Sequence, residues 1–230
     1  MPSLSDPLGL VLFDFDGTLC DSAATISSTL KRSCDALGIS SPPEDAMRGN
    51  IGHGLMHLAL AYTDGDAEMA EKLFTTYRQI AMEDLQKAEL EKDPLFDGVP
   101  KMLATLKEQG WLLGVVTNKS RHGLDNLLAH HQIDHFFDVT ATIDEYQGKP
   151  APDMVDGALS SVGVDARHAV LVGDTEIDAG AAQNASLRFL GVAWGYHTVE
   201  RLNAAGAAEI IASFDDLPDM LERWWQEQVV

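Results

Sequence analysis

The chain has few cysteines and no long hydrophobic run. Its 230 residues include only Cys20 and Cys34, so we expect no disulfide framework, and this usage is typical of a reducing compartment. No apolar run approaches about 20 residues, the length that a membrane-spanning helix requires. The first seven residues carry no basic cluster, and the apolar run at 8–13 is too short for a signal-peptide core. We therefore expect a cytoplasmic protein.

Basic residues are also scarce. The chain has 16 Lys and Arg against 36 Asp and Glu, which gives a net charge of −20. Such a charge repels nucleic acid and anionic membranes, so neither is expected as a partner. It would repel a small anionic substrate as well, unless a local positive site received it. The hydrophobic content of 45% is ordinary for a globular protein, and the length suffices for one domain with a smaller accessory domain.

One stretch, LVLFDFDGT at residues 10–18, combines a buried-strand pattern with acidic residues. Four apolar residues lead directly into Asp14, and Asp16 follows two positions later. Such a run is typical of a parallel strand that is buried on both faces, and ligands bind beyond the carboxyl ends of such strands. Two carboxylates this close suit a hard divalent cation such as Mg²⁺. The alternative is a surface turn, because Asp and Gly are common turn residues.

After residue 98 the sequence alternates between apolar runs and amphipathic stretches. Strands are expected at 112–116, 138–142, 169–172, 189–193 and 209–212. Helices are expected up to residue 109 and at 121–131, 152–161, 177–185 and 216–227. This alternation predicts an α/β fold built on a doubly wound parallel sheet.

No strand pattern appears between the first strand and this alternating region. Helices are expected there at 22–37, within 39–51, at 55–62 and at 66–90. Ser22 can cap the first of them, and Gly38 can end it. A helical block of about 70 residues is too long for a simple crossover. We therefore expect an all-helical cap domain at 20–95, inserted into a core domain formed by 1–19 and 96–230.

Two segments of the predicted core are suited to an anionic ligand. Thr117 and Asn118 follow an expected strand, where a hydroxyl and backbone amides can hold a phosphate oxygen; the alternative is a cap for the next helix. Lys149 precedes Pro150, which restricts it to an extended backbone. A lysine held in this way can neutralise a phosphate or a cluster of carboxylates. The alternative is a solvated surface lysine.

Another apolar run, at 169–172, ends in acidic residues. Asp174 follows it, and Asp178 lies four residues further on, at the start of a helix. Asp178 could simply serve the helix N-terminus, whereas Asp174 has no such role and could supply another carboxylate to a metal ion. Asp14 and Asp174 would then lie at one edge of the sheet. Together with a nearby hydroxyl and lysine, they are the groups that phosphoryl transfer requires.

These segments resemble, in order, the four motifs of the haloacid dehalogenase superfamily. The motif residues are Asp14 and Asp16, then Thr117, then Lys149, then Asp174 and Asp178. The helical insertion after the first motif is similar to the C1-type cap of that superfamily. The resemblance implies that Asp14 is a nucleophile that forms an aspartyl-phosphate and that Asp16 is a general acid/base. True dehalogenases of the superfamily lack the second aspartate, so its presence favours phosphate chemistry.

The resemblance also implies a metal ion and a phosphate site. An Mg²⁺ ion would be bound by Asp14, the backbone carbonyl of Asp16, Asp174 and, in support, Asp178. The transferring phosphoryl group would be held by Thr117, Asn118 and Lys149. The expected partner is a small phosphorylated metabolite, and the expected state is a monomer or a homodimer.

Within the superfamily the chain is most similar to phosphoglycolate phosphatases. The segments FDFDGTL, VVTNK, GKPAP, GDTEID and WGY follow their pattern, whereas Asn184-Ala185-Ser186 departs from it. The resemblance implies a phosphatase whose first candidate substrate is 2-phosphoglycolate. The alternatives are a sugar-phosphate phosphatase, a phosphohexomutase and, in another class, a non-catalytic binding module of the same fold.

The loop at 48–54, RGNIGHG, is the segment of the cap that we expect to recognise the substrate. Its glycines allow backbone amides to approach a ligand, and the following helix N-terminus favours an anion. Arg48 could bind the carboxylate of a small acid, and His53 lies in the same loop. The alternative is a plain helix–helix turn that leaves Arg48 in solvent.

Overall fold

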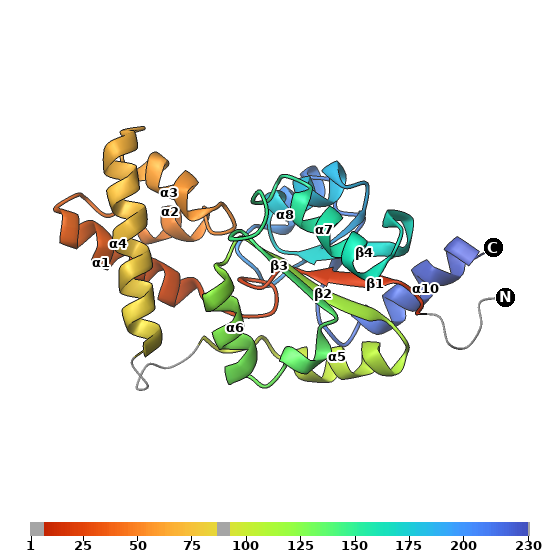
Figure 1. The fold of residues 1–230 in the computed structure, drawn as a ribbon. Helices are drawn as coiled ribbons and strands as arrows, with labels where there is room; N and C mark the ends of the chain where they lie inside the picture. Colours follow the sequence, from red (N-terminus) through yellow and green to blue (C-terminus); the bar gives the residue numbers. More distant parts are fainter. Residues whose placement is uncertain (1–6, 87–92, 230) are drawn as a thin grey trace.

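The computed structural model describes residues 7–86 and 93–229. There the chain forms an α/β core with a helical insertion (Figure 1). The strands form one parallel sheet in the order β3-β2-β1-β4-β5-β6. They are β1 (Leu10–Phe13), β2 (Leu112–Thr117), β3 (Val139–Thr142), β4 (Ala169–Gly173), β5 (Arg188–Val192) and β6 (Glu209–Ile211). The predicted fold class is confirmed.

Strand β1 lies inside the sheet because it is apolar on both faces. Leu10 and Leu12 pack into one hydrophobic cluster, whereas Val11 and Phe13 pack into the cluster on the other face. Successive side chains of a strand alternate between faces, so a continuous apolar run requires a covering layer on each side.

Helices cover both faces of the sheet. One layer contains α5 (Val99–Glu108), α6 (Arg121–His130) and α10 (Leu217–Val229). The other contains α7 (Asp153–Val162), α8 (Glu176–Asn184) and α9 (Val199–Ala204). Short 3-10 turns lie at Asp134–Phe136 and Ala166–His168.

Helices α1 to α4 form the insertion between β1 and β2, which we call the cap. They are α1 (Ala23–Leu37), α2 (Glu44–Arg48), α3 (Leu55–Tyr62) and α4 (Ala67–Gln86). Leu30, Cys34 and Leu73 belong to a buried cluster that is made of cap residues alone. The cap therefore has a hydrophobic core of its own, and Figure 1 shows it to one side of the sheet. The predicted helical insertion is confirmed.

The two chain segments that join the cap to the core are paired with each other. Cys20 and Leu95 form an antiparallel bridge. The amide of Asp21 donates to the carbonyl of Pro94 at 2.9 Å, and the amide of Phe96 donates to the carbonyl of Leu19 at 3.0 Å. The junction is therefore a short two-stranded ribbon.

Several details differ from the sequence-based expectations. Ser22 makes no side-chain capping bond to α1; its hydroxyl donates to Asp16 instead. Gly38 ends α1 with a left-handed backbone, as expected. Helix α9 was not predicted, because its six residues are too few to show a clear period. The expected end of the longest cap helix, at 87–90, lies outside the described residues.

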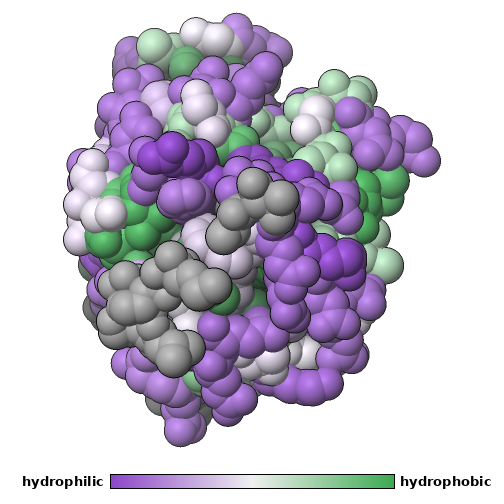
Figure 2. Space-filling model, turned by 90° about the vertical axis from the view of Figure 1, so that its right-hand side faces the viewer, coloured by the Kyte–Doolittle hydropathy of each residue, from purple (hydrophilic) through white to green (hydrophobic). Residues whose placement is uncertain are grey.

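Figure 2 shows the side of the molecule that lies at the right of Figure 1, away from the cap. Hydrophilic residues cover most of this face, and hydrophobic surface occurs in separate patches. Among residues 7–86 and 93–229, no helix is both long enough and apolar enough to cross a membrane.

Candidate active site

The carboxyl ends of three neighbouring strands bring the predicted polar residues together. Asp14 directly follows β1, Thr117 is the last residue of β2, and Asp174 directly follows β4. Because β1 lies between β2 and β4, these three residues meet at one edge of the sheet. Their exposed fractions are 3%, 1% and 0%, so the polar groups are held inside the protein.

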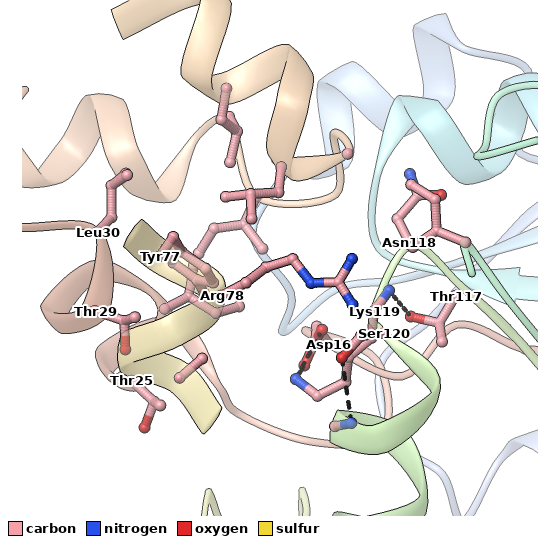
Figure 3. A pocket seen from close by; sticks show the side chains of 18 of the residues that line it. Asp16, Thr25, Thr29, Leu30, Tyr77, Arg78, Thr117, Asn118, Lys119 and Ser120 are labelled. Atoms are coloured by element: carbon pink, nitrogen blue, oxygen red, sulfur yellow. Dashed lines mark hydrogen bonds and ion pairs between the residues drawn. The ribbon is translucent and has the colours of Figure 1, made fainter. Parts of the chain in front are cut away.

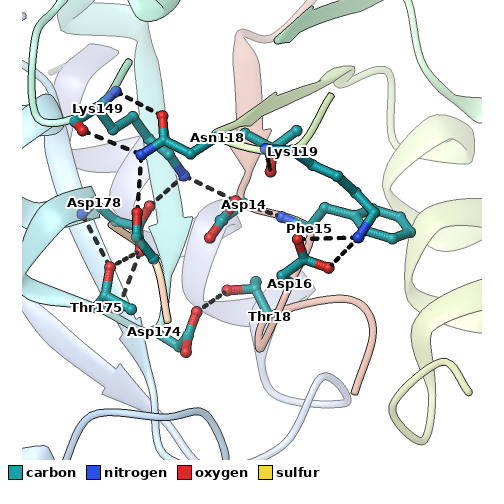
Figure 4. Close-up of polar contacts among 12 residues, drawn as sticks. Asp14, Phe15, Asp16, Thr18, Asn118, Lys119, Lys149, Asp174, Thr175 and Asp178 are labelled. Carbon is teal, nitrogen blue, oxygen red and sulfur yellow. Dashed lines mark hydrogen bonds and ion pairs between the residues drawn. The ribbon is translucent and has the colours of Figure 1, made fainter. Parts of the chain in front are cut away.

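Three buried carboxylates share this edge of the sheet. Asp14, Asp174 and Asp178 each offer an oxygen, and these oxygens lie within 4.8 Å of one another. Lys149 Nζ lies 2.8 Å from Asp14 Oδ1 and 2.5 Å from Asp178 Oδ1 (Figure 4). Lys149 is only 4% exposed, so the alternative of a solvated surface lysine does not hold.

Burial and mutual repulsion shift the protonation of this cluster. Burial raises the pKa of Asp14 to about 7, with the charges of Asp178 and Asp16 adding to the effect and Lys149 opposing it. Burial, followed by the charges of Asp178 and Asp14, holds the pKa of Asp174 well above its ordinary value. Burial disfavours the charged form of Lys149, yet the two adjacent carboxylates raise its pKa.

The donor set fits a divalent cation. Three carboxylates face a single ammonium group, so the cluster carries excess negative charge in a buried place. Carboxylate oxygens are the ligands that hard cations such as Mg²⁺ prefer. A bound divalent cation would favour the charged forms of Asp14 and Asp174, which opposes the burial and the mutual repulsion that raise their pKa values.

Asp174 is fixed by its neighbours on both oxygens. Oδ1 accepts from the hydroxyl of Thr18 at 3.0 Å, and Oδ2 accepts from the amide of Tyr196 at 2.8 Å. Two glycines make room for this carboxylate: a Cβ on Gly195 would lie 2.1 Å from Asp174 Cβ, and one on Gly17 would lie 2.3 Å from Oδ2. Gly17 also has a φ of +85°, which disfavours a side chain.

Asp178 takes part in both the start of α8 and the carboxylate cluster. Its Oδ2 accepts from the amide and the hydroxyl of Thr175, and the Thr175 hydroxyl accepts from the Asp178 amide, which forms a capping box at the start of α8. Its Oδ1 contacts Lys149. The helix start thus fixes a carboxylate that also holds the buried lysine.

Asp16 lies apart from the carboxylate cluster. Its Oδ1 accepts from the Ser22 hydroxyl, and Lys119 Nζ lies 2.9 and 3.2 Å from its two oxygens. The Lys119 and Asp16 side chains are only 17% and 14% exposed. Lys119 was not predicted as a site residue, although it stands in the VVTNK segment directly after Thr117 and Asn118.

Asn118 connects three parts of the site. Its amide nitrogen donates to the carbonyl of Gly52 at 2.8 Å and to that of Lys149 at 3.1 Å, and its oxygen accepts from the Lys149 amide at 2.8 Å. Thr117 Oγ1 accepts from the Lys119 amide at 3.2 Å. The Asn118 side chain therefore positions Lys149 and ties the cap loop to the core.

A cavity of about 640 Å³ lies between the cap and this edge of the sheet (Figure 3). On the core side it is lined by Asp14, Asp16, Thr117, Asn118 and Lys119. On the cap side most of the lining is apolar and includes Ile26, Leu30, Ile51, Leu55, Met56, Phe74, Tyr77 and Met82. The polar core groups thus lie across the cavity from a mostly apolar wall.

The loop at 48–54 docks on the core but does not bring all of its residues into the cavity. His53 lines the cavity, and its ring stacks on His57 at 4.5 Å. Burial lowers the pKa of His53. Arg48 is exposed, is not among the cavity-lining residues, and lies over the Tyr196 ring at 5.6 Å. The structure therefore does not place Arg48 where the sequence interpretation needed it.

Comparison with known proteins identifies the family. The family described as "Haloacid dehalogenase-like hydrolase" matches residues 11–192. The chain belongs to this family. The matched range includes all four predicted motifs and the cap, so the resemblance seen in the sequence is confirmed.

Relatives of this hydrolase include proteins named phosphoglycolate phosphatase and proteins named pyrophosphatase. A "Phosphoglycolate phosphatase, plasmid" from Cupriavidus necator is 33% identical over 224 residues, which cover 96% of each chain. A "Pyrophosphatase PpaX" from Bacillus mycoides is 28% identical and covers 94% of this chain and 98% of that protein. The crystal structure of a predicted phosphatase from Clostridium acetobutylicum has a TM-score of 0.82 and 29% identity, covering 95% of this chain and all of that one.

Proposed function

We propose that this hydrolase is an Mg²⁺-dependent phosphomonoesterase that acts on a small phosphorylated metabolite through an aspartyl-phosphate. The observation that carries the proposal is the buried group of Asp14, Lys149, Asp174 and Asp178 at the carboxyl ends of β1 and β4. In this proposal the core, bounded at 1–19 and 96–230, performs the chemistry, and the cap at 20–95 covers it.

Asp14 is the proposed nucleophile. Phe15 N–H and Lys149 both contact Oδ1, whereas Oδ2 accepts no hydrogen bond from the described residues. Oδ2 attacks phosphorus, a P–O bond forms to the carboxylate, and the bond from phosphorus to the substrate oxygen breaks. Lys149 and the Thr117 hydroxyl hold the phosphoryl oxygens during this transfer.

Asp16 is the proposed general acid and base. It gives its proton to the departing alkoxide, so that the first product leaves as an alcohol. It then takes a proton from a water molecule, which attacks the phosphorus of the aspartyl-phosphate. Inorganic phosphate leaves, and the carboxylate of Asp14 is restored. Ser22 and Lys119 keep the Asp16 side chain in one orientation throughout.

Asp14 and Asp174, with Asp178 in support, would hold the metal ion, and the Asp16 backbone carbonyl is the further ligand that the family resemblance implies. When bound, Mg²⁺ would supply charge neutralisation between the carboxylates and the phosphoryl group. Asp174 is suited to this because Thr18 and Tyr196 fix both of its oxygens.

The first candidate substrate is 2-phosphoglycolate, because relatives at about 30% identity are named phosphoglycolate phosphatase. Inorganic pyrophosphate is the second, since other relatives are named pyrophosphatases. Both compounds carry a second anionic group beside the phosphoryl group that would be transferred. Arg48, which the sequence suggested as the residue that binds this second anionic group, does not line the cavity.

Asp14→Asn tests the proposal directly. We expect it to lower the rate of phosphate release by at least about 10³-fold, because the nucleophile is lost while the shape of the side chain is kept. The measurement is phosphate release from a panel of phosphorylated metabolites. Chelation of divalent ions should stop the wild-type protein, and added Mg²⁺ should restore it.

The wild-type protein must release phosphate from some member of the panel, or the chain is a binding module. Return of the phosphoryl group to a sugar, followed by ³¹P NMR, would instead show a mutase. Activity that survives in Asp14→Asn or after complete chelation would overturn the covalent, metal-dependent route.

A further inference from the structure

We propose that Arg78 on α4 binds the second anionic group of the substrate, which makes it the specificity-determining residue of the cap. The inference rests on the proposed function and names what the cap recognises: a phosphate monoester or anhydride that also carries a carboxylate or another phosphoryl group. Figure 3 shows the Arg78 side chain extending from α4 toward the loop that carries Asn118 and Lys119.

Of the arginines and lysines that line the cavity, Arg78 has the weakest contact with a neighbouring carboxylate. Among the described residues that line it, the arginines and lysines are Arg32, Arg78 and Lys119. Lys119 contacts both oxygens of Asp16, and Arg32 contacts both oxygens of Asp84. Within residues 7–86 and 93–229, Arg78 has one ion pair, a long one of 3.7 Å to Asp144, and its guanidinium also lies over the Phe74 ring.

Arg78 can leave Asp144 at little cost. The Arg78 side chain is 49% exposed, and an ion pair of this kind contributes little to stability because water and salt screen it. Asp144 would keep a partner, since its Oδ2 accepts from the Arg121 amide at 2.8 Å. If Arg78 exchanges Asp144 for an anion of the substrate, the Asp144 carboxylate therefore still has a hydrogen-bond partner.

The surroundings strengthen a contact between Arg78 and an anion inside the cavity. Apolar cap residues, Phe74 and Tyr77 among them, line the wall beside Arg78, and the Phe74 ring lies 5.7 Å from the guanidinium. A substrate bound in the cavity would displace water from this half-exposed guanidinium, and opposite charges attract more strongly once water is displaced. His53 does not compete for this role, because burial lowers its pKa and favours the neutral ring.

Arg78→Gln tests the inference, because glutamine keeps much of the stem and removes the charge. We expect kcat/KM for 2-phosphoglycolate or pyrophosphate, whichever the wild type prefers, to fall about 10- to 100-fold. For ethyl phosphate, which has the ester linkage of 2-phosphoglycolate and a neutral tail, kcat/KM should change by less than about threefold.

Two further variants make the result specific. Lys72→Gln removes one positive charge from the same helix; Lys72 is exposed, pairs with Glu68 and does not line the cavity, so no substrate should be affected. Asp144→Asn removes the competing carboxylate and should raise kcat/KM for the doubly anionic substrate about 1.4- to 5-fold. Arg78→Gln and Asp144→Asn should thus shift kcat/KM for the doubly anionic substrate in opposite directions.

Equal losses on ethyl phosphate and on the doubly anionic substrate, or no loss on either, would overturn the role of Arg78. So would a fall in kcat/KM in Asp144→Asn when its melting temperature matches that of the wild type. A wild-type protein that hydrolyses none of the three compounds, nor any of the wider panel, would instead overturn the proposed function.

Discussion

Asp14 and Asp16 are two residues apart in the chain but lie in different surroundings. Asp14 is held by Lys149 inside the carboxylate cluster, whereas Asp16 turns toward Lys119 and Ser22. Each acidic side chain therefore has its own cation. Such a separation lets one carboxylate serve as a nucleophile while the other handles protons.

Asp16→Asn is expected to discriminate between leaving groups. An alkyl phosphate needs a proton on its departing oxygen, so its kcat/KM should fall about 10²- to 10⁴-fold. An activated aryl phosphate needs less proton donation, so the fold-decrease in its kcat/KM should be smaller by a factor of at least about ten. The measurement is kcat/KM for both ester types. Asp21→Asn, at an exposed position nearby, is the control and should leave both values unchanged. An equal loss on both esters in Asp16→Asn would remove the acid role.

The sequence predicted where a residue lies when a strand end fixed its position. Asp14, Thr117 and Asp174 follow continuous apolar runs, and the pairing of parallel strands brings such positions to one edge. Lys119 was missed because its partner, Asp16, is 103 residues away in sequence. Arg48 was misplaced because the path of a glycine-containing loop is set by docking contacts that no periodic pattern records.

At the scale of the elements, the ends of β1 and β4 and the start of α8 concentrate negative charge. Burial raises the pKa of Asp14 to about 7 and raises that of Asp174 as well. In the absence of a divalent cation, the folded protein therefore retains protons that the unfolded chain has already released. Proton binding then favours the folded state at low pH.

We expect the metal-free protein to lose stability as the pH rises from about 4 to about 7. The free energy of unfolding should fall by up to about 1.4 kcal/mol per pH unit for each raised carboxyl. Saturating Mg²⁺ should reduce this fall. At pH 7.5 and 100 times its dissociation constant, Mg²⁺ should raise the melting temperature by about 5–10 °C.

Calorimetry with and without a chelator measures both effects. Asp174→Asn is the matched variant: it should be more stable than the wild type when both are metal-free at pH 7.5, and it should gain less from Mg²⁺. A melting temperature that is insensitive to Mg²⁺ at every pH would show that the carboxylate cluster binds no cation.

Element prediction succeeded for long, strongly patterned segments. Strand β1 and helices α1 and α4 have apolar residues at the spacing of their structure, and their type was predicted correctly. Helix α9 is too short for such a signal. The wrong role for Ser22 has a physical cause as well, because a hydroxyl beside a helix start can bond to a distant carboxylate instead.

At the scale of the whole molecule, one loop of the cap docks on the core by hydrogen bonds. Asn118 donates to Gly52, and the His197 ring donates to the carbonyl of Gly49 at 3.2 Å. Gly52 has a φ of +104°, and a Cβ there would lie 2.8 Å from the Thr175 methyl group. The helical pattern predicted that a cap exists, but not which of its residues touch the core, because such contacts join distant parts of the chain.

Gly52→Ala is expected to impair this docking. The added methyl group must displace the loop from Thr175, so the cap would close less completely, and kcat/KM should fall about tenfold. Gly65→Ala is the matched control, since Gly65 also lies in the cap with a φ of +81° but has nothing within 4 Å of the added Cβ. Both variants carry similar backbone strain, and only Gly52→Ala carries the clash. Equal kinetics in the two would show that docking of this loop does not govern activity.

The paired connections between cap and core constrain how the cavity can open. Cys20 and Leu95 are bridged, and the amides of Asp21 and Phe96 bond across the ribbon. Sliding of one connection past the other would break these bonds, so we expect the cap to open by bending at this ribbon. We then expect Asp14 and Arg78 to return to the same relative positions at each closure. A substrate would bind with its phosphoryl group at Asp14 and its second anionic group at Arg78.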